Sequence, residues 1–367
     1  MTLRLIWRRF ARAPSGHRRF AESVRANTLP TARRGLEGWL VTCALVIGLG
    51  ASPGAIGQGT TAPAALRVVV ISDLNESYGS VRYSTAVSHA VKRITEVRPD
   101  LVISTGDMVA GQRLAPPMKR AELEAMWTAF HEAVSDPLGR AGVPFAVTPG
   151  NHDASTGTRF AIDRTVYREQ WLPRRPALDF VDASGYPFNY AFAVGPVLFV
   201  SLDATYVGHL AAREKRWLAN LLEQHGPRFR YRVVFSHIPL WPFSVGRETE
   251  FLGDDELERI LQQHRVDLHL SGHHHAYYPG EKDGVRYVGQ ACLGAAPRPL
   301  LGTGQPSEHA ITVIEFPSQG RISVEGYRGP DFTQRIDRRT LPERVTSKRA
   351  TLLRDDLAGA PGSAGPK

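Results

Sequence analysis

Five apolar runs in this sequence each end in side chains that can bind a metal ion. The runs read RVVVISD, LVISTGD, PFAVTPGNHD, RVVFSH and LHLSGHHH. In α/β proteins, reactive and ligand-binding groups gather just beyond the carboxyl ends of the strands. We therefore expect the residues that end these runs to meet at one edge of a sheet. They are Asp73, Asp107, Asn151, His152, Asp153, His237, His273, His274 and His275.

The spacing within the runs favours a site for two metal ions. Residues i and i+2 of an extended chain point to the same side, so His273 and His275 can face one centre. The same holds for Asp73 and Asn75. Two ions about 3.5–4 Å apart need a shared ligand, and the Asp107 carboxylate is well placed to bridge them. Oxygen and imidazole ligands suit divalent or trivalent Mn, Fe or Zn rather than a thiolate zinc site.

The segments that position these residues alternate between strand and helix patterns. From residue 66 onward, short β-branched runs alternate with amphipathic stretches, which is typical of βα units. Helices are predicted over residues 84–97, 119–134, 213–224 and 255–264. After about residue 284 the helical patterns stop, and antiparallel strands are predicted over residues 285–288, 310–316 and 321–325. The sequence therefore predicts an α/β domain.

The first 58 residues differ in composition from the rest and are predicted to be a leader. Residues 1–38 hold nine Arg and two Glu, and so carry +7 of the net charge of +9. The apolar core at 39–50 is too short to span a bilayer comfortably, and Ala55-Ile56-Gly57 offers small residues to signal peptidase. We expect a linker at 59–65 and an exported protein, periplasmic or secreted. The alternative is an uncleaved membrane anchor, which would be the protein's membrane contact.

Charge and cysteine content exclude further classes. The other 329 residues carry only +2, which argues against a dedicated nucleic-acid-binding protein. Cys43 lies in the apolar leader, which leaves Cys292 alone in the body of the chain. We therefore expect no internal disulfide, and we interpret Cys292 as a small core or loop residue.

The order of these motifs resembles the calcineurin-like metallophosphoesterase superfamily. Its pattern is D-x-H, then G-D, then G-N-H-D/E, then H, then G-H-x-H. The chain contains Gly106-Asp107, Gly150-Asn151-His152-Asp153, His237 and Gly272-His273-His274-His275, within residues 66–327. The resemblance implies a four-layer α/β/β/α sandwich with two central mixed sheets over 66–327. A basic C-terminal extension, disordered at its end, is expected at 328–367.

The resemblance also implies two ligand sets. One ion would be held by Asp73, Asp107 and His275. The other would be held by Asp107, Asn151, His237 and His273. In the first motif Asn75 stands at the histidine position, and we include it as a metal ligand. Our hypothesis is that its shorter amide gives a looser first ion with a shifted metal preference, rather than a dead site.

The remaining site residues receive roles beside the ions. The resemblance places His152 next to the scissile bond, where it stabilises charge on the phosphoryl oxygens and can protonate the leaving oxygen. Asp153 is expected to support catalysis by orienting a loop or a ring nitrogen. His274 is expected to be a spacer that points away from the ions.

Two functions follow from these residues. The first is an exported metal-dependent phosphoesterase that hydrolyses phosphate monoesters or diesters, with a metal-bridged hydroxide as nucleophile. The alternative is a non-catalytic or weakly active metal-binding protein of the same fold that has lost the first metal. Asn75 is the residue on which the choice depends. The predicted partner is a phosphate-ester substrate whose identity the sequence leaves open.

Overall fold

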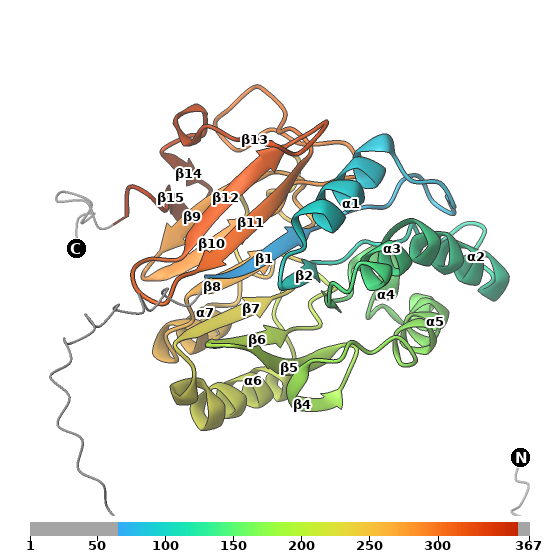
Figure 1. Ribbon diagram of the computed structural model, residues 1–367, viewed down its shortest axis with the longest axis horizontal. Helices are drawn as coiled ribbons and strands as arrows, with labels where there is room; N and C mark the ends of the chain where they lie inside the picture. The colour runs from blue at the N-terminus through green and yellow to red at the C-terminus, as the bar shows by residue number, and fades with distance from the viewer. Residues whose placement is uncertain (1–64, 359–367) are drawn as a thin grey trace, which may run out of the picture. The chain divides into compact units, whose positions relative to one another are not determined.

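The structure is a computed structural model that describes residues 65–358, and its framework is a pair of β-sheets (Figure 1). The first sheet has six strands in the order β13-β12-β11-β1-β2-β3. β1, β2 and β3 are parallel neighbours, whereas β11 pairs antiparallel with β1. The strands are β1 (Leu66–Ile71), β2 (Leu101–Ser104), β3 (Phe145–Val147), β11 (Ala310–Phe316), β12 (Ser323–Arg328) and β13 (Gln334–Arg335).

The second sheet has nine strands in the order β14-β15-β9-β10-β8-β7-β6-β5-β4. Its centre is parallel, because β10, β8, β7 and β6 pair in that sense, and its flanks are antiparallel. The strands are β4 (Asp179–Gly185), β5 (Asn189–Val194), β6 (Val197–Ser201), β7 (Tyr231–Phe235), β8 (Leu268–Ser271), β9 (Tyr278–Lys282), β10 (Val285–Gly289), β14 (Arg344–Thr346) and β15 (Thr351–Arg354).

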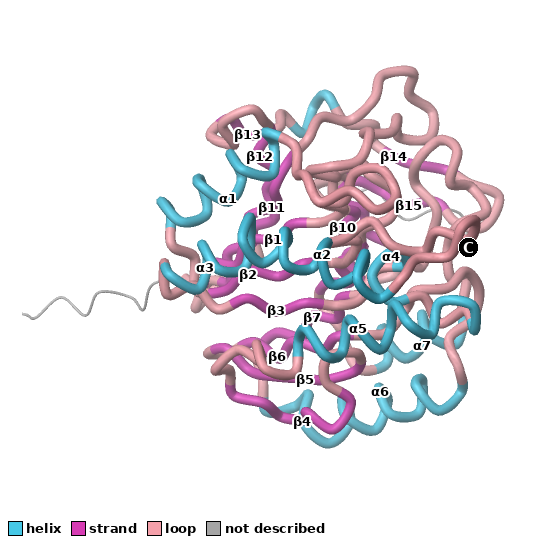
Figure 2. Tube along the Cα trace, turned by 90° about the vertical axis from the view of Figure 1, so that its right-hand side faces the viewer, coloured by secondary structure: helices cyan, strands magenta, loops and turns pink. Residues whose placement is uncertain are grey.

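Helices cover the outer faces of the two sheets (Figure 2). The helices on the first sheet's side include α1 (Thr85–Val97), α2 (Arg120–Phe130) and the short α3 (Asp136–Arg140), and α5 (Ala161–Trp171) packs against α2. The second sheet carries α6 (Ala212–His225) and α7 (Asp255–Gln263). Strand alternation explains the layering: Val197 and Phe199 of β6 enter the core between the sheets, whereas Leu198 and Val200 pack with α6 and α7. The predicted four-layer fold with two mixed sheets is confirmed.

Two helical segments differ from the predictions. The predicted helix at 119–134 ends at Phe130 and continues as a π-helical turn, His131–Ser135, before α3 begins beside Pro137. Helix α5 was not predicted from the sequence, because only a few of its side chains, including Val166, Tyr167 and Trp171, are buried. The described residues also contain short helical turns: α4 (Asn151–Ala154), η2 (Thr158–Phe160), η3 (Gly226–Arg228) and η4 (Arg338–Thr340).

Strand pairing continues past the predicted domain limit at residue 327. β13 extends the first sheet beside β12, and β15 joins the second sheet beside β9. The predicted leader at 1–58 and the end of the chain from 359 lie outside the described residues. Within 65–358, no helix is both long and apolar enough to span a membrane.

Candidate metal centre

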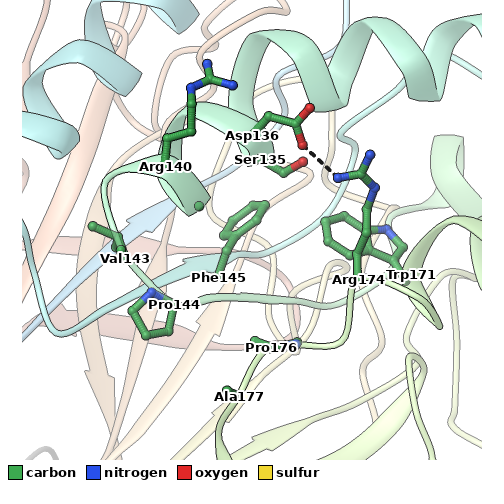
Figure 3. A pocket seen from close by; sticks show the side chains of 12 residues that line it. Ser135, Asp136, Arg140, Val143, Pro144, Phe145, Trp171, Arg174, Pro176 and Ala177 are labelled. Carbon is green, nitrogen blue, oxygen red and sulfur yellow. Dashed lines mark hydrogen bonds and ion pairs between the residues drawn. The ribbon is translucent and has the colours of Figure 1, made fainter.

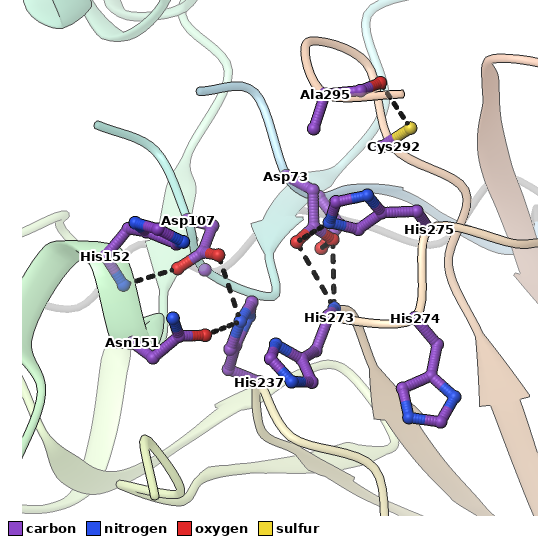
Figure 4. Close-up of polar contacts among 12 residues, drawn as sticks. Asp73, Asp107, Asn151, His152, His237, His273, His274, His275, Cys292 and Ala295 are labelled. Atoms are coloured by element: carbon purple, nitrogen blue, oxygen red, sulfur yellow. Dashed lines mark hydrogen bonds and ion pairs between the residues drawn. The ribbon is translucent and has the colours of Figure 1, made fainter. Parts of the chain in front are cut away.

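The five motifs lie directly after β1, β2, β3, β7 and β8, as the sequence analysis predicted. Three of these strands belong to the first sheet and two to the second. Figure 4 shows the side chains from both sheets converging on one region. The site therefore lies where the carboxyl ends of parallel strands from two sheets meet.

The backbone at this edge adopts conformations that hold the ligands close together. Asp73, Asp107, His273 and His275 have φ of 50°, 53°, 64° and 52°, in the left-handed region. Such conformations cost free energy for side chains other than glycine, and they persist where the surrounding structure enforces them. Gly150 leaves no room for a side chain, since an added Cβ would lie 2.1 Å from both the N and the Oδ1 of Asp107.

Asp107, His237 and His273 form the first ligand cluster. One ligand atom from each lies within 4.8 Å of the others, and all three residues are buried. His237 Nε2 lies 3.2 Å from Asp107 Oδ2 and 2.9 Å from Asn151 Oδ1. His237 Nδ1–H donates to the Thr105 carbonyl at 2.8 Å, so Nε2 is the nitrogen that faces the cluster. These three residues and Asn151 are the four ligands predicted for the second ion, and they lie close together.

Electrostatics at this cluster favour a cation. Burial by itself lowers the pKa of His237, but the adjacent Asp107 carboxylate raises it to about 9. Burial raises the pKa of Asp107, yet the neighbouring His237 and His152 hold it below its usual value. The buried carboxylate thus imposes a negative potential, which a bound metal ion would neutralise in place of a proton.

Asp73 and His275 form the second cluster, and Asn75 lines the same small cavity as His275. His275 Nε2 lies 3.2 Å from Asp73 Oδ1, and its Nδ1–H donates to the Ala296 carbonyl at 3.1 Å. Asn75 is 6% exposed, and its Oδ1 is buried without a hydrogen-bond partner among the described residues. A carboxylate, an imidazole nitrogen and an orphaned amide oxygen together suit a divalent ion, so these residues fit the metal that the fold implies.

His152 lies at the mouth of the site. Its Nδ1–H donates to the Gly111 carbonyl at 3.1 Å, and its ring centroid lies 5.3 Å from that of Tyr78. The ring lines a cavity of about 190 Å³, together with Asn75 and Asp107. Because Nδ1 is held by the Gly111 carbonyl, Nε2 is the nitrogen of this ring that remains for a ligand in the cavity.

Asp153 and His274 organise the loops instead of facing the cluster. Asp153 Oδ1 accepts N–H bonds from Met108 and Val109 at 2.8 and 2.9 Å, and Oδ2 accepts one from Gly150 at 2.9 Å. Burial and the Asp107 carboxylate raise the pKa of Asp153 to about 7, but three N–H donors fit the ionised form best. Asp153 thus orients a loop, one of its two expected roles.

The predicted spacer role of His274 agrees with its contacts. His274 Nε2–H donates to the Glu250 carbonyl at 2.9 Å, and Nδ1 accepts the N–H of Phe243 at 3.3 Å. Figure 4 shows its ring directed away from the two clusters. Burial, followed by the neighbouring His273, holds the pKa of His274 well below its usual value, so it is a neutral structural histidine.

Three polar residues at the site were not found from the sequence. Gln112 Oε1 accepts Asn151 Nδ2–H at 2.8 Å, which turns the Asn151 oxygen toward His237. Glu250 Oε2 accepts His273 Nε2–H at 3.0 Å, which leaves Nδ1 of that ring as the ligand atom. Arg247 pairs with Glu250. None of the three belongs to a motif that follows a strand, so no sequence signal marked them.

A larger cavity lies at the other end of β3. Its volume is about 620 Å³, and Phe145 and Trp171 are among the residues that line it (Figure 3). The Arg174–Asp136 ion pair, at 2.7 Å, lies at its side. The cavity contains none of the predicted ligands. The larger cavity is therefore not the candidate reaction site. The smaller cavity beside His152 is the candidate, because predicted metal ligands line it.

Comparisons with known proteins agree with this geometry. The model of the family described as "Calcineurin-like phosphoesterase" matches residues 66–277. A Bos taurus protein named serine/threonine-protein phosphatase CPPED1 is 22% identical over 246 residues, covering 64% of this chain and 69% of that protein. The crystal structure of a dimetal phosphatase from Danio rerio aligns with a TM-score of 0.51 at 15% identity, covering 74% of this chain and 98% of that one.

Proposed function

Because the chain belongs to the calcineurin-like phosphoesterase family, we propose that it hydrolyses phosphate esters with two metal ions bound at the edge shared by its sheets. The observation that carries the proposal is the buried group of Asp107, His237 and His273, whose ligand atoms lie within 4.8 Å of one another. A single ion would bind to this group. The second cluster, around Asp73, supports the proposal that a second ion binds beside it.

Each ligand has a distinct task in this proposal. Asp107 Oδ2 lies 3.2 Å from His237 Nε2, and Oδ1 accepts the backbone N–H of His152 at 2.8 Å. In this proposal its carboxylate would be the ligand shared by the two ions. His237, His273 and Asn151 complete one site, and Asp73, His275 and Asn75 complete the other. Bound ions would polarise the phosphoryl oxygens and lower the pKa of water.

His152 supplies the proton chemistry. Its Nδ1–H is held by the Gly111 carbonyl, which fixes the ring and leaves Nε2 to act on the substrate. A protonated Nε2 can donate to a phosphoryl oxygen or to the leaving oxygen, which contributes roughly 10²–10⁴-fold to rate in other enzymes. The ring borders the cavity beside Asn75 and Asp107, which is consistent with this position.

The test is turnover of metal-loaded protein. Purified protein with Mn²⁺, Zn²⁺ or Fe²⁺ should hydrolyse 4-nitrophenyl phosphate or bis(4-nitrophenyl) phosphate and contain two equivalents of metal by elemental analysis. The variant His152→Ala should lose activity by roughly 10²–10⁴-fold and keep its metal. His209→Ala, which removes an exposed imidazole elsewhere, is the matched control. Wild-type turnover no higher than that of His152→Ala with every metal would favour the non-catalytic alternative.

Substrate and location belong to the same proposal. The name of the bovine relative points to phosphorylated protein side chains, so a phosphoserine peptide should be included among the substrates tested. We also propose export through residues 1–58, on the composition of that segment. N-terminal sequencing of protein recovered from the native host would test cleavage near residue 58.

A further inference from the structure

Tyr78 is an exposed aromatic residue on the wall of the candidate reaction cavity. It follows β1, it is 55% exposed, and it lines the cavity together with Asn75, Asp107 and His152. Six other large apolar side chains are exposed in the described part of the chain, but none of them lines this cavity. Single exposed apolar side chains are common on protein surfaces, so the position of Tyr78, rather than its exposure, is the informative observation.

The loop that carries Tyr78 is held by its backbone. The Ser80 N–H donates to the Ser77 carbonyl at 2.9 Å, which closes a turn with Tyr78 at its second position. Gly79, at the third position, has φ of 81°, the sign that favours glycine there. The Gly79 N–H donates to the Ala110 carbonyl at 2.9 Å and so ties the turn to the loop that follows β2. An exposed ring on a fixed backbone binds at a smaller entropic cost than a ring on a mobile loop.

The ring of Tyr78 lies beside the proposed proton donor. The centroids of the Tyr78 and His152 rings are 5.3 Å apart, and their planes are tilted by 44°. Aromatic side chains contact one another at centroid separations of about 4.5–7 Å. His152 is proposed to act on the leaving oxygen of the substrate. An aromatic group bonded to that oxygen would therefore lie within reach of the Tyr78 ring.

The size of the cavity indicates that much of the leaving group lies outside it. The cavity has a volume of about 190 Å³. Pockets that enclose a whole small ligand measure about 300–1,000 Å³. A phosphoryl group beside the metal ligands would fill part of this space, so a leaving group of more than a few atoms would extend past the wall. Tyr78 is exposed on that wall, where its ring can cover an apolar face of such a group.

We propose that Tyr78 contacts the leaving group, and that the site prefers esters whose leaving oxygen carries an aromatic ring over esters of small polar alcohols. Two aromatic rings in offset or edge-to-face contact gain free energy beyond that of the apolar area they bury. A short polar alkyl group has neither the area nor the π system for this contact. The inference rests on the proposed hydrolysis and adds the class of leaving group.

The experiment compares an aromatic and an alkyl ester of the same charge. Wild type, Tyr78→Ala and Tyr78→Phe, each loaded with metal, are assayed by phosphate release for kcat and KM on the N-acetyl amides of O-phosphotyrosine and O-phosphoserine. Benzylphosphonate and ethylphosphonate, whose P–C bond takes the place of the ester bond, are titrated as ligands by calorimetry. Metal content is measured for every variant.

Tyr206→Ala is the matched control. Tyr206 is 69% exposed in the loop after β6, and it does not line the cavity. The control therefore removes an exposed tyrosine from another loop without removing the proposed contact. It should match wild type on both esters.

The expected result is a selective loss. Tyr78→Ala should lower kcat/KM for the phosphotyrosine amide by roughly 3- to 10-fold, the fold-change that an aromatic pair contributes, and mainly through a higher KM. The affinity for benzylphosphonate should fall by the same factor, whereas the phosphoserine amide and ethylphosphonate should change little. Tyr78→Phe should keep the preference of wild type, because the ring rather than the hydroxyl makes the contact.

Three results would overturn the inference. The first is an equal loss of kcat on both esters, which would make Tyr78 a positioning residue for His152. The second is unchanged affinity for benzylphosphonate in Tyr78→Ala, and the third is a loss in Tyr206→Ala as large as that in Tyr78→Ala.

Phosphonate binding does not require turnover, so it separates this inference from the proposed function. A wild type that binds benzylphosphonate through Tyr78 yet hydrolyses neither ester contradicts the proposed function and supports the aromatic contact. A wild type that hydrolyses both esters, with a Tyr78→Ala variant that matches it, contradicts this inference alone.

Discussion

Replacing Asp153 by Asn should weaken the fold and metal binding together. The carboxylate accepts N–H bonds from Met108 and Val109 through Oδ1 and from Gly150 through Oδ2, all at 2.8–2.9 Å. If Oδ1 keeps its two donors, the new Nδ2–H₂ group faces the Gly150 N–H. One charge-assisted hydrogen bond, worth about 1.5–3 kcal/mol, is lost. The Gly150 N–H and the new Nδ2–H₂ group are then buried donors without an acceptor, which costs about 1–3 kcal/mol more. The free energy of unfolding should therefore fall by about 3–5 kcal/mol.

Metal affinity should fall as well, because the two loops joined by Asp153 carry Asp107 and Asn151. Loss of a supporting contact of this kind costs about 10–100-fold in affinity. Urea unfolding of metal-loaded protein and a competition titration with a chelator measure the two effects. Asp182→Asn is the matched control, since that carboxylate, in β4, accepts hydrogen bonds from Trp217 Nε1–H of α6 and from the backbone N–H of Ser184. An Asp153→Asn variant with unchanged stability and metal affinity but lost turnover would refute this reasoning and assign Asp153 to the chemistry.

Three further outcomes are expected. Asn75→His should hold the first ion more tightly, measured as metal retained after dialysis against a chelator; equal retention and the same preferred metal in both proteins would contradict a loose site. Gly150→Ala should cost about 1–3 kcal/mol of stability and displace Asp107, because its Cβ would lie 2.1 Å from that residue, whereas Gly139→Ala, with nothing within 4 Å, should be tolerated. Burial lowers the pKa of His131 to about 4, so the folded protein holds it neutral and should lose up to about 3 kcal/mol of stability as pH falls from 6.5 to 4. His131→Gln should flatten this part of the stability–pH profile measured by urea unfolding, and parallel profiles would contradict the assignment.

The position of the proposed ligands could be predicted from sequence because each follows an apolar run that becomes a strand. Asp73, Asp107 and His237 lie two or three residues after the end of a strand, and strand ends in α/β folds converge. Asp153 was correctly placed in the loop, but its choice of backbone N–H donors over a ring nitrogen depends on how two loops approach. His274 was distinguished from its neighbours by the alternation of an extended chain.

Other features required the three-dimensional structure. Arg247 and Glu250 reach the site from a long loop between β7 and α7, and the path of that loop is set by packing rather than by local pattern. Helix α5 has too few buried residues to give a clear period. The π-helical turn at His131–Ser135 inserts within an otherwise regular amphipathic pattern, which a periodicity argument treats as one helix.

The division of the proposed ligands between two sheets has a mechanical consequence. Asp73, Asp107 and Asn151 follow strands of the first sheet, and His237, His273 and His275 follow strands of the second. An ion held by members of both groups acts as a non-covalent cross-link between layers that otherwise meet through side-chain packing and loop hydrogen bonds. Its binding free energy becomes stability of the folded chain, about 4 kcal/mol at a free concentration of 1,000 times Kd. Release of such an ion would be coupled to a small separation of the layers.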